Sequence, residues 1–301
     1  MDVRHLQLLR ELDDRGSVTA VAAATHRTVS AVSQQLRTAQ RSAGMALVEP
    51  DGRGIRLTEA GRLLAAGAVE VDTALAAVQA RWDAYRNHAG GPVSIIAFPS
   101  AATLLFPSLL PAAEQAGIGL TVTDIDPSES DFADLAADHD IVIAHSLSGP
   151  RPEGTAGLAV RELTVEPLDI ALSAAHPLAE GAVLRAEDVA DATWIGVPEG
   201  YPFDAVLRSI GERAGRRPRV EQRVRDNRLI EALVASSNHL AILPRFTTRT
   251  TDELALRPIG DVPTSRHMSA VMRPDRARRR AVQTMLEAIS DALSAHAVRP
   301  N

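Results

Sequence analysis

GSVTAVAAATHRTVSAVSQQL, residues 16–36, carries the signals for two short helices joined by a tight turn. Ser17 stands where the first helix begins and Thr28 where the second begins. A hydroxyl at such a position caps a helix by accepting a hydrogen bond from a free backbone N–H. Gly44 ends the second helix, and we expect its inner face to hold Val29, Val32 and Leu36. Two helices in this arrangement are typical of a helix-turn-helix, whose second helix enters the major groove of DNA.

The segments on either side extend this module. An apolar stripe at helical spacing predicts one preceding helix, and it consists of Val3, Leu6, Leu9 and Leu12. Residues 48–58, VEPDGRGIRLT, place Pro, Asp and Gly between two short extended pieces, which predicts a hairpin, or wing. This wing would present Arg53 and Arg56, and Thr58 can cap the next helix.

A long helix with a regular apolar seam follows the wing. The seam has alternating spacings of four and three residues, and its members are Leu64, Ala68, Val71, Leu75, Val78, Trp82 and Tyr85. This a/d pattern predicts a coiled coil, and a second copy of the helix could cover it. We therefore expect a homodimer, with packing of the helix on its own domain as the alternative. Residues 87–92, NHAGGP, end the helix and form a linker.

Strands alternate with helices from residue 93 onward. The expected strands are 93–97, 120–125, 141–144, 165–173, 193–197, 219–224 and 240–243. The expected helices are 101–115, 128–137, 203–214, 227–236 and 282–296. This alternation predicts an α/β fold with largely parallel sheets, and the segment is long enough for two small lobes.

Composition excludes several classes of protein. With 45% hydrophobic and 23% charged residues in 301, the chain is neither disordered nor collagen-like. The absence of cysteine excludes a disulfide framework, a thiolate metal site and a cysteine nucleophile. We find no His pair at metal-ligand spacing, no glycine-rich nucleotide motif and no Gly-x-Ser-x-Gly. No apolar run approaches the roughly 20 residues of a membrane span. We therefore expect a soluble cytoplasmic protein that is not an enzyme and needs no cofactor, metal or membrane.

Charge is unevenly distributed along the chain. Residues 15–62 carry seven Arg against three acidic residues, a net charge of +4. Residues 63–301 carry 23 Arg against 31 acidic residues, a net charge of −8. A basic N-terminal segment on an acidic body indicates a polyanion-binding module joined to a domain of another kind.

Taken in order, these motifs resemble the LysR-type transcriptional regulator family. The N-terminal signature stands here as Gly16-Ser17-Val18-Thr19, Ala22-Ala23-Ala24, Thr28-Val29-Ser30-Ala31-Val32-Ser33-Gln34-Gln35-Leu36 and Leu57-Thr58-Glu59-Ala60-Gly61. Two later motifs also look like family landmarks, namely His176-Pro177-Leu178-Ala179 and His239-Leu240-Ala241-Ile242-Leu243-Pro244. The resemblance covers essentially the whole chain. It implies a bacterial regulator of transcription with a winged helix-turn-helix, a linker helix and an effector domain similar to a periplasmic binding protein.

Within this module, hydroxyl, amide and guanidinium groups on the second helix and the wing are the candidates for DNA contacts. Such groups hydrogen-bond base edges or neutralise phosphates. The candidate residues are Thr28, Ser30, Ala31, Ser33, Gln34, Arg37, Arg53 and Arg56. The alternative is that the two serines and the wing arginines are only solvated surface positions.

Effector contacts are expected where strands end and helices begin in the α/β domain. Ser100 and Thr103 stand after the first strand, where free backbone N–H groups and hydroxyls could hold a carboxylate. The resemblance adds the turn after the third strand and the second lobe near residues 198–203. The candidates are Ser100, Ala101, Thr103, His145, Ser146 and Phe203. For Ser100 the alternative role is a helix cap, and His145 fits a packed hinge residue better than a ligand contact.

We therefore predict an α/β protein with an N-terminal winged helix-turn-helix (1–58), a dimerisation helix (59–89) and a two-lobed effector domain (90–301). The first lobe would span 92–163 and 268–301, and the second 164–267. The predicted partners are double-stranded promoter DNA, a small, anionic effector and a second copy of the chain, in a dimer or a tetramer. Two alternatives remain: a small-molecule-binding protein whose N-terminal helices only dimerise it, and, more weakly, an α/β enzyme with a regulatory domain.

Overall fold

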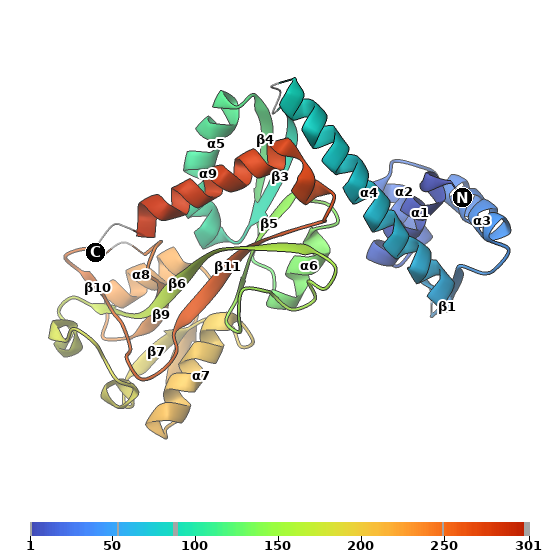
Figure 1. Cartoon of the computed structure of the whole chain (residues 1–301). Helices are drawn as coiled ribbons and strands as arrows, with labels where there is room; N and C mark the ends of the chain where they lie inside the picture. Colours follow the sequence, from blue (N-terminus) through green and yellow to red (C-terminus); the bar gives the residue numbers. More distant parts are fainter. Residues whose placement is uncertain (1, 53, 87–89, 249, 298–301) are drawn as a thin grey trace. The chain divides into compact units, whose positions relative to one another are not determined.

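The computed structural model describes residues 2–52, 54–86, 90–248 and 250–297. It divides into two compact units, and Figure 1 shows the elements of both. The N-terminal unit is Met1–Ala89 with Arg273–Arg280, and the C-terminal unit is Gly90–Met272 with Ala281–Asn301. Arg273–Arg280 is thus grouped with the N-terminal unit, although from the sequence we expect it in the first effector lobe.

The N-terminal unit has the expected order of helices followed by a hairpin and a long helix. Its elements are α1 (Val3–Arg15), α2 (Val18–Ala24), α3 (Val29–Ala43), β1 (Val48–Asp51), β2 (Gly54–Leu57), α4 (Glu59–Tyr85) and η4 (Arg276–Arg278). The predicted caps are present, since the side chains of Ser17, Thr28 and Thr58 each accept a hydrogen bond from a backbone N–H in the first turn. Gly16 and Gly44 adopt the left-handed conformation that ends α1 and α3.

A small apolar core holds these helices together. Its buried members are Leu8, Leu9, Leu12, Val21, Ala22, Val32, Leu36, Ala39, Leu47, Leu57 and Ala65. Val29 is not among them and is 47% exposed, so its prediction as an inner-face residue is wrong. Val29 is the first residue of α3, one turn before the buried stretch, and the inner face runs instead through Val32, Leu36 and Ala39.

Buried arginines link α1 and α4 to the segment Arg273–Arg280. Arg10 on α1 donates to Asp72 on α4 at 3.0 Å and to Asp275 at 2.7 Å. Arg273 in turn donates to Glu11 at 2.9 Å. A buried guanidinium needs such partners, because an unpaired charge away from water is costly.

The C-terminal unit alternates strands and helices as expected. Its elements are β3 (Gly91–Ala97), α5 (Pro99–Gln115), β4 (Ile118–Asp124), η1 (Glu129–Asp131), α6 (Phe132–Leu135), β5 (Ile141–Ser146), β6 (Ala159–Ser173), η2 (Pro177–Glu180), η3 (Ala186–Val189), β7 (Thr193–Gly196), α7 (Pro202–Ala214), β8 (Arg219–Arg223), α8 (Asn227–Ala235), β9 (Ala241–Pro244), β10 (Leu254–Arg257), β11 (Ser265–Met272) and α9 (Arg280–Ala297). The strands β10 and β11 were not anticipated from the sequence.

The main sheet is mixed, so the expectation of largely parallel sheets is wrong. Its strand order is β10-β6-β11-β5-β3-β4, with β9 also paired to β6. The pairs β3–β4 and β3–β5 are parallel, and so is the separate pair β7–β8. The pairs made by β6 and β11 are all antiparallel. The two unanticipated strands, β10 and β11, form three of those four pairs. Because the sequence pattern did not indicate these two strands, it did not indicate their antiparallel pairs either.

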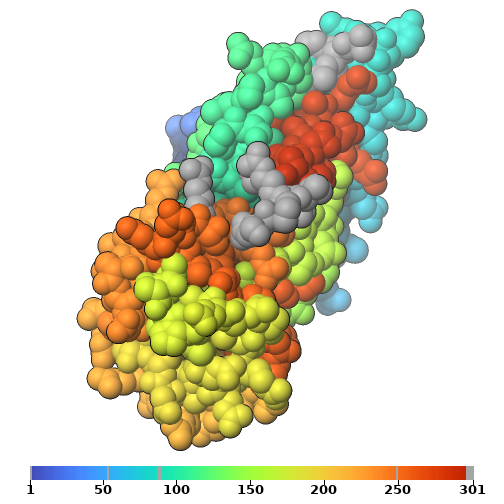
Figure 2. Space-filling view, turned by 90° about the vertical axis from the view of Figure 1, so that its left-hand side faces the viewer, coloured from blue at the N-terminus to red at the C-terminus, as the bar shows by residue number. Residues whose placement is uncertain are grey.

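Strand β6 connects two lobes. Its first half pairs with β11 and its second half with β9 and β10. We call the part with β3, β4, β5 and α5 lobe one, where α5 packs beside β3 and β4 (Figure 1). The part with β7 to β10, α7 and α8 is lobe two, and it has its own apolar core. Figure 2 shows lobe two, coloured yellow to orange, gathered at the lower end of the view.

Candidate functional site

The exposed face of α3 carries most of the residues predicted to contact DNA. Ser30, Gln34 and Arg37 are exposed, while Ala31 and Ser33 are half-buried. Thr28 is exposed but engaged, since its hydroxyl accepts from the backbone N–H of Ala31 at 3.2 Å and lies 3.1 Å from the Ser30 hydroxyl. The structure therefore gathers six of the predicted residues on one helix and its cap.

Residues of α1 and α2 border the same face. A pocket of about 840 Å³ is lined by Ala31 and Gln34 together with Arg4, His5 and Arg27. Three of these five side chains carry basic groups, and the two arginines were absent from the sequence prediction. The guanidinium of Arg4 is 80% exposed and pairs with Asp2 at 2.9 Å.

Gln35 connects α3 to the start of α1 and to the turn before α3. The sequence predicted no separate role for it. Its amide N donates to the backbone carbonyl of Arg4 at 2.8 Å. Its amide O accepts from Nη1 of Arg27 at 2.6 Å. One side chain of α3 thus holds both the start of α1 and the turn before α3. Gln35 is half-buried in the structure, and no signal in the sequence separates it from the neighbouring Gln34.

The wing forms as predicted, with β1 and β2 paired antiparallel. Arg56 lies on β2 and donates from Nε to Glu49 on β1 at 2.8 Å. Both side chains are largely exposed, at 61% and 45%. Such a pair contributes at most about 1 kcal/mol, so the guanidinium can exchange Glu49 for a phosphate. Arg53 lies outside the described residues.

The apolar seam of α4 is only partly covered within the chain. Ala68 is buried and Leu64 packs against the N-terminal core. The rest of the seam is exposed, and it consists of Val71, Leu75, Val78, Trp82 and Tyr85. The two aromatic rings stack with their centroids 5.8 Å apart. By length and composition α4 is also long and apolar enough to cross a membrane, which for a single helix is weak evidence, and 11% of its most apolar window is buried.

Ser100 lies in the first turn of α5, one residue inside the helix rather than at its cap. Its hydroxyl accepts a hydrogen bond from Nη2 of Arg266 on β11 at 2.9 Å. Thr103 is exposed, and its hydroxyl donates to the carbonyl of Pro99 at 2.9 Å. Ala101 is buried in the core. Among the three residues predicted on this helix, Ser100 therefore has a polar partner on a strand, namely Arg266 on β11.

Arg266 is the buried centre of this region. It is 3% exposed and forms an ion pair with Glu166 on β6, which is fully buried, at 2.6 Å. Its Cζ lies 4.7 Å from the ring centroid of Phe98 and 5.5 Å from that of Phe203. Phe203 belongs to lobe two and Phe98 precedes α5 in lobe one, so the guanidinium lies between rings of both lobes.

His145 is packed among aromatic rings rather than facing solvent. Its ring lies edge-on to Phe98, with centroids 4.7 Å apart, and to Phe132 at 5.1 Å. Burial, with a smaller contribution from the charge of Arg266, lowers the pKa of His145 to about 3, so the imidazole is neutral at physiological pH. Ser146 is also buried, and its hydroxyl lies 2.9 Å from that of Ser148.

A second arginine lies between the lobes. Arg225 of lobe two lies 3.6 Å from Asp126, which follows β4 in lobe one. Its Cζ is also 5.0 Å from the ring centroid of Tyr201. Burial raises the pKa of the Asp126 carboxyl. Neither residue was predicted from sequence, because nothing in their local pattern separates them from ordinary surface charges.

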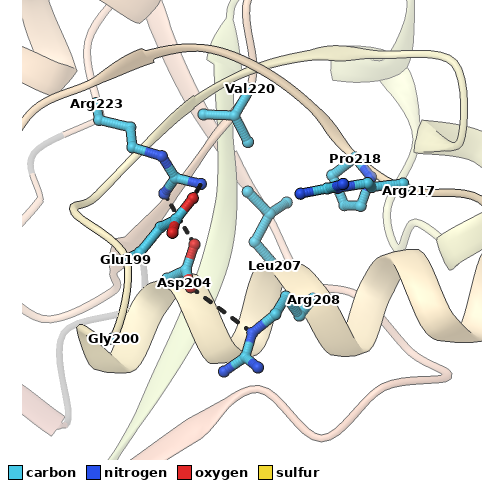
Figure 3. Close-up of a pocket in the computed structure, with 9 residues that line it drawn as sticks. All are labelled: Glu199, Gly200, Asp204, Leu207, Arg208, Arg217, Pro218, Val220 and Arg223. Carbon is cyan, nitrogen blue, oxygen red and sulfur yellow. Dashed lines mark hydrogen bonds and ion pairs between the residues drawn. The ribbon is translucent and has the colours of Figure 1, made fainter.

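Lobe two also has a pocket of about 340 Å³ along α7 (Figure 3). It is lined by Glu199, Gly200, Asp204, Leu207, Arg208, Arg217, Pro218, Val220 and Arg223, and it includes none of the predicted effector residues. Arg223 donates to Asp204 at 2.9 Å and to Glu199 at 3.2 Å. Among the described residues, no group of three or more His, Asp or Glu is arranged to hold a metal ion.

Comparisons with known proteins agree with both units. The family model described as "Bacterial regulatory helix-turn-helix protein, lysR family" matches residues 3–62, and the LysR substrate binding domain matches residues 86–294. The transcriptional dual regulator GltC of Bacillus subtilis (strain 168) is 25% identical over 279 residues, covering 91% of each chain.

Solved structures share the fold. A full-length OxyR variant from Pseudomonas aeruginosa superposes with a TM-score of 0.64 at 20% identity, covering 96% of this chain and 98% of that one. Full-length CbnR complexed with its target DNA gives a TM-score of 0.52 at 20% identity, covering 97% and 99%. Because its substrate-binding domain model alone spans more than half of the sequence, the chain belongs to the LysR family of transcriptional regulators, which are not enzymes.

Proposed function

We propose that this regulator binds a specific promoter sequence as a homodimer and that a small anionic effector in the C-terminal unit controls that binding. The observation that carries the DNA part is the outward face of α3, which holds Ser30, Gln34 and Arg37 on a capped helix of a winged helix-turn-helix. Base edges need such hydrogen-bonding groups, and phosphates need exposed guanidinium groups like that of Arg56.

The exposed seam on α4 supports the dimer. Exposed apolar side chains at seam spacing include Leu75 at 62% and Trp82 at 52%. A second copy of α4 buries the same side chains by symmetry, and a twofold dimer presents two DNA-binding heads to two half-sites. We also place the domain boundaries at 58 and 89, and we place the protein in the cytoplasm, where promoter DNA lies. A tetramer is the other assembly that this helix allows.

The contacts of Ser100 support the effector site. Arg266 reaches Ser100 from β11, and rings from both lobes surround the guanidinium. Because groups from both lobes meet at Arg266, a ligand that binds there can change the orientation of one lobe relative to the other. We therefore place the effector at Ser100, Ala101, Thr103, His145, Ser146 and Phe203, and describe its action as a shift between two populations with different head spacing.

Selection of genomic DNA fragments by the purified full chain tests the proposal. We expect one family of related sites with two half-sites, protected together in a footprint. Binding to random DNA of the same length should be weaker by roughly 10³-fold or more. If selected and random fragments bind equally well, the alternative of a small-molecule-binding protein that dimerises through its N-terminal helices replaces this function.

A further inference from the structure

A short segment from late in the chain belongs to the N-terminal unit. Arg273–Arg280, which we call the bridging segment, is grouped with Met1–Ala89 rather than with the elements that flank it in the sequence. Strand β11 ends at Met272, directly before the segment, and α9 begins at Arg280, its last residue. The bridging segment is therefore covalently continuous with a strand that pairs with both β5 and β6.

Two buried arginines make the polar contacts of this segment. Arg273 belongs to the segment, and its side chain is 8% exposed. Its Nη1 donates to Glu11 on α1 at 2.9 Å, and its Nη2 lies 3.3 Å from Asp14 on the same helix. Arg10 of α1 is 5% exposed and donates to Asp275 of the segment at 2.7 Å. The contact thus has one buried guanidinium on each side.

This network leaves one buried donor without an acceptor. Nε of Arg273 has no hydrogen-bond partner among the residues that the structure describes. It lies 4.0 Å from Oδ1 of Asp275, and that same oxygen accepts from Nη2 of Arg10. Two guanidinium groups therefore compete for one carboxylate. A buried donor that stays unsatisfied is unfavourable, so the docked arrangement is less stable than a network in which every group is paired.

Charged contacts of this kind favour a segment that is either docked or released. A buried ion pair adds little net stability, because the two charges lose their hydration when they are buried. Removal of a single charge, however, leaves its partner buried and unpaired, which is strongly unfavourable. Partial release of the segment is therefore disfavoured, whereas complete release returns all of the charged groups to water. Such a contact can open and close as a unit.

We propose that Arg273 is a positioning residue that couples DNA binding by the N-terminal unit to the end of strand β11. Arg10 is shared between Asp275 of the segment and Asp72 of α4, so docking of the segment restrains α1 on α4. A restrained unit loses less freedom when it binds DNA, and bound DNA therefore favours the docked segment.

The coupling is reciprocal. A state of β11 that favours docking raises the affinity for DNA by the same factor by which DNA favours docking. This proposal goes beyond control by an effector, because it needs only that the N-terminal unit binds DNA.

Hydrogen exchange in the full-length protein measures this coupling directly. The probe is a duplex that the fragment selection recovers, or a random duplex of the same length if no site is selected. Exchange is followed in residues 270–280, where the backbone N–H of Ala277 donates to Arg273 and that of Arg278 to Asp275. Bound DNA should slow this exchange by roughly fivefold or more, the lower end of coupling between linked sites.

Arg273→Gln and Glu11→Gln each remove one charge, from opposite sides of the same contact. Because the segment is released in both variants, DNA should no longer slow exchange in residues 270–280. The affinity for DNA should fall by the same factor as the effect that is lost. Arg273→Lys keeps the positive charge and should restore part of both effects. If Arg273→Gln fails to fold, Glu11→Gln and the isosteric Asp275→Asn decide the question.

Arg245→Gln is the matched control for loss of a buried ion pair. Nη2 of Arg245 lies 2.6 Å from Oδ1 of Asp169, and both residues belong to the C-terminal unit. This variant should lower the unfolding midpoint and keep the effect of DNA on residues 270–280.

Three results overturn the coupling. The first is the same exchange in residues 270–280 with and without bound DNA. The second is an undiminished effect of DNA in folded Arg273→Gln and Glu11→Gln. The third is loss of the effect in Arg245→Gln as well, which would assign it to general stability. Fragment selection by the unmodified chain separates these results from the proposed function, because failure to select a site removes promoter specificity and leaves the exchange experiment with random DNA intact.

Discussion

Arg225 and Asp126 face each other from the two lobes, with Nε 3.6 Å from Oδ2. The carboxylate is partly buried and the guanidinium is largely exposed, at 27% and 59% of the side chain. The pair is therefore a cross-lobe contact of the weak, partly solvated kind. Such a contact can open without a large cost in stability.

For Asp126→Asn we expect a change of no more than about 1 kcal/mol in the free energy of unfolding at neutral pH. Burial raises the pKa of Asp126 in the folded chain above its unfolded value. A raised pKa means that the folded state binds its proton first as the pH falls. The gain in stability of the unmodified chain over the variant should therefore be fully present below the unfolded pKa and be lost as the pH rises through the folded pKa.

Paired urea melts of the two proteins across acidic to neutral pH measure this difference. A difference that is independent of pH would contradict the assignment of Asp126 as the titrating group. A difference of opposite sign would show that the attraction of Arg225 outweighs the effect of burial.

Leu75→Asp or Val78→Asp should separate the dimer. Both side chains are more than half exposed in the single chain, so the substitution leaves the protomer folded. In the dimer each change places a charge in the apolar seam, at a cost of several kcal/mol. Sedimentation should show loss of the dimer together with loss of footprinting on two half-sites.

Ala74→Asp provides the control for this helix. Residue 74 is also exposed on α4 but lies outside the seam. It should remain dimeric at the same protein concentration. If Leu75→Asp and Ala74→Asp behave alike, the seam of α4 is not the interface.

Arg56→Ala should weaken binding to all DNA sequences alike. Its guanidinium is exposed on the wing, and its ion-pair partner among the described residues is Glu49, so it can neutralise a phosphate. Loss of one phosphate contact per subunit reduces the slope of log affinity against log salt by about one unit per subunit. Titrations at several salt concentrations with specific and random DNA measure both effects, and Glu49→Ala should have the opposite, strengthening effect.

Gln34→Ala and Ser33→Ala should relax the preference for particular base pairs. Gln34 is exposed on α3 and Ser33 is half-buried beside it. A good base contact contributes roughly 1–3 kcal/mol of discrimination. Binding to a library with each operator position changed in turn locates the effect. An equal loss for specific and random DNA would reassign Gln34 to phosphate contact.

Local sequence signals were sufficient for the elements of the N-terminal unit. Hydroxyl residues at Ser17, Thr28 and Thr58 and glycines at Gly16 and Gly44 mark the helix boundaries where the structure has them. These signals are reliable because a cap satisfies backbone groups only a few residues away. The seam on α4 is equally visible, since its spacing depends on the helix alone.

Long-range pairing decided the rest. The strands β10 and β11 lack a clear alternating pattern, and their antiparallel partners are distant in sequence, as Met268 opposite Thr164 illustrates. Arg266 looks like a charged residue in a short polar stretch, yet it is buried against Glu166, a hundred positions away. A charged side chain such as that of Arg266 becomes buried only when residues from other strands pack around it. The sequence thus determined the family, the DNA-facing helix and the caps, whereas only the tertiary structure brought Arg266, Glu166 and Ser100 together.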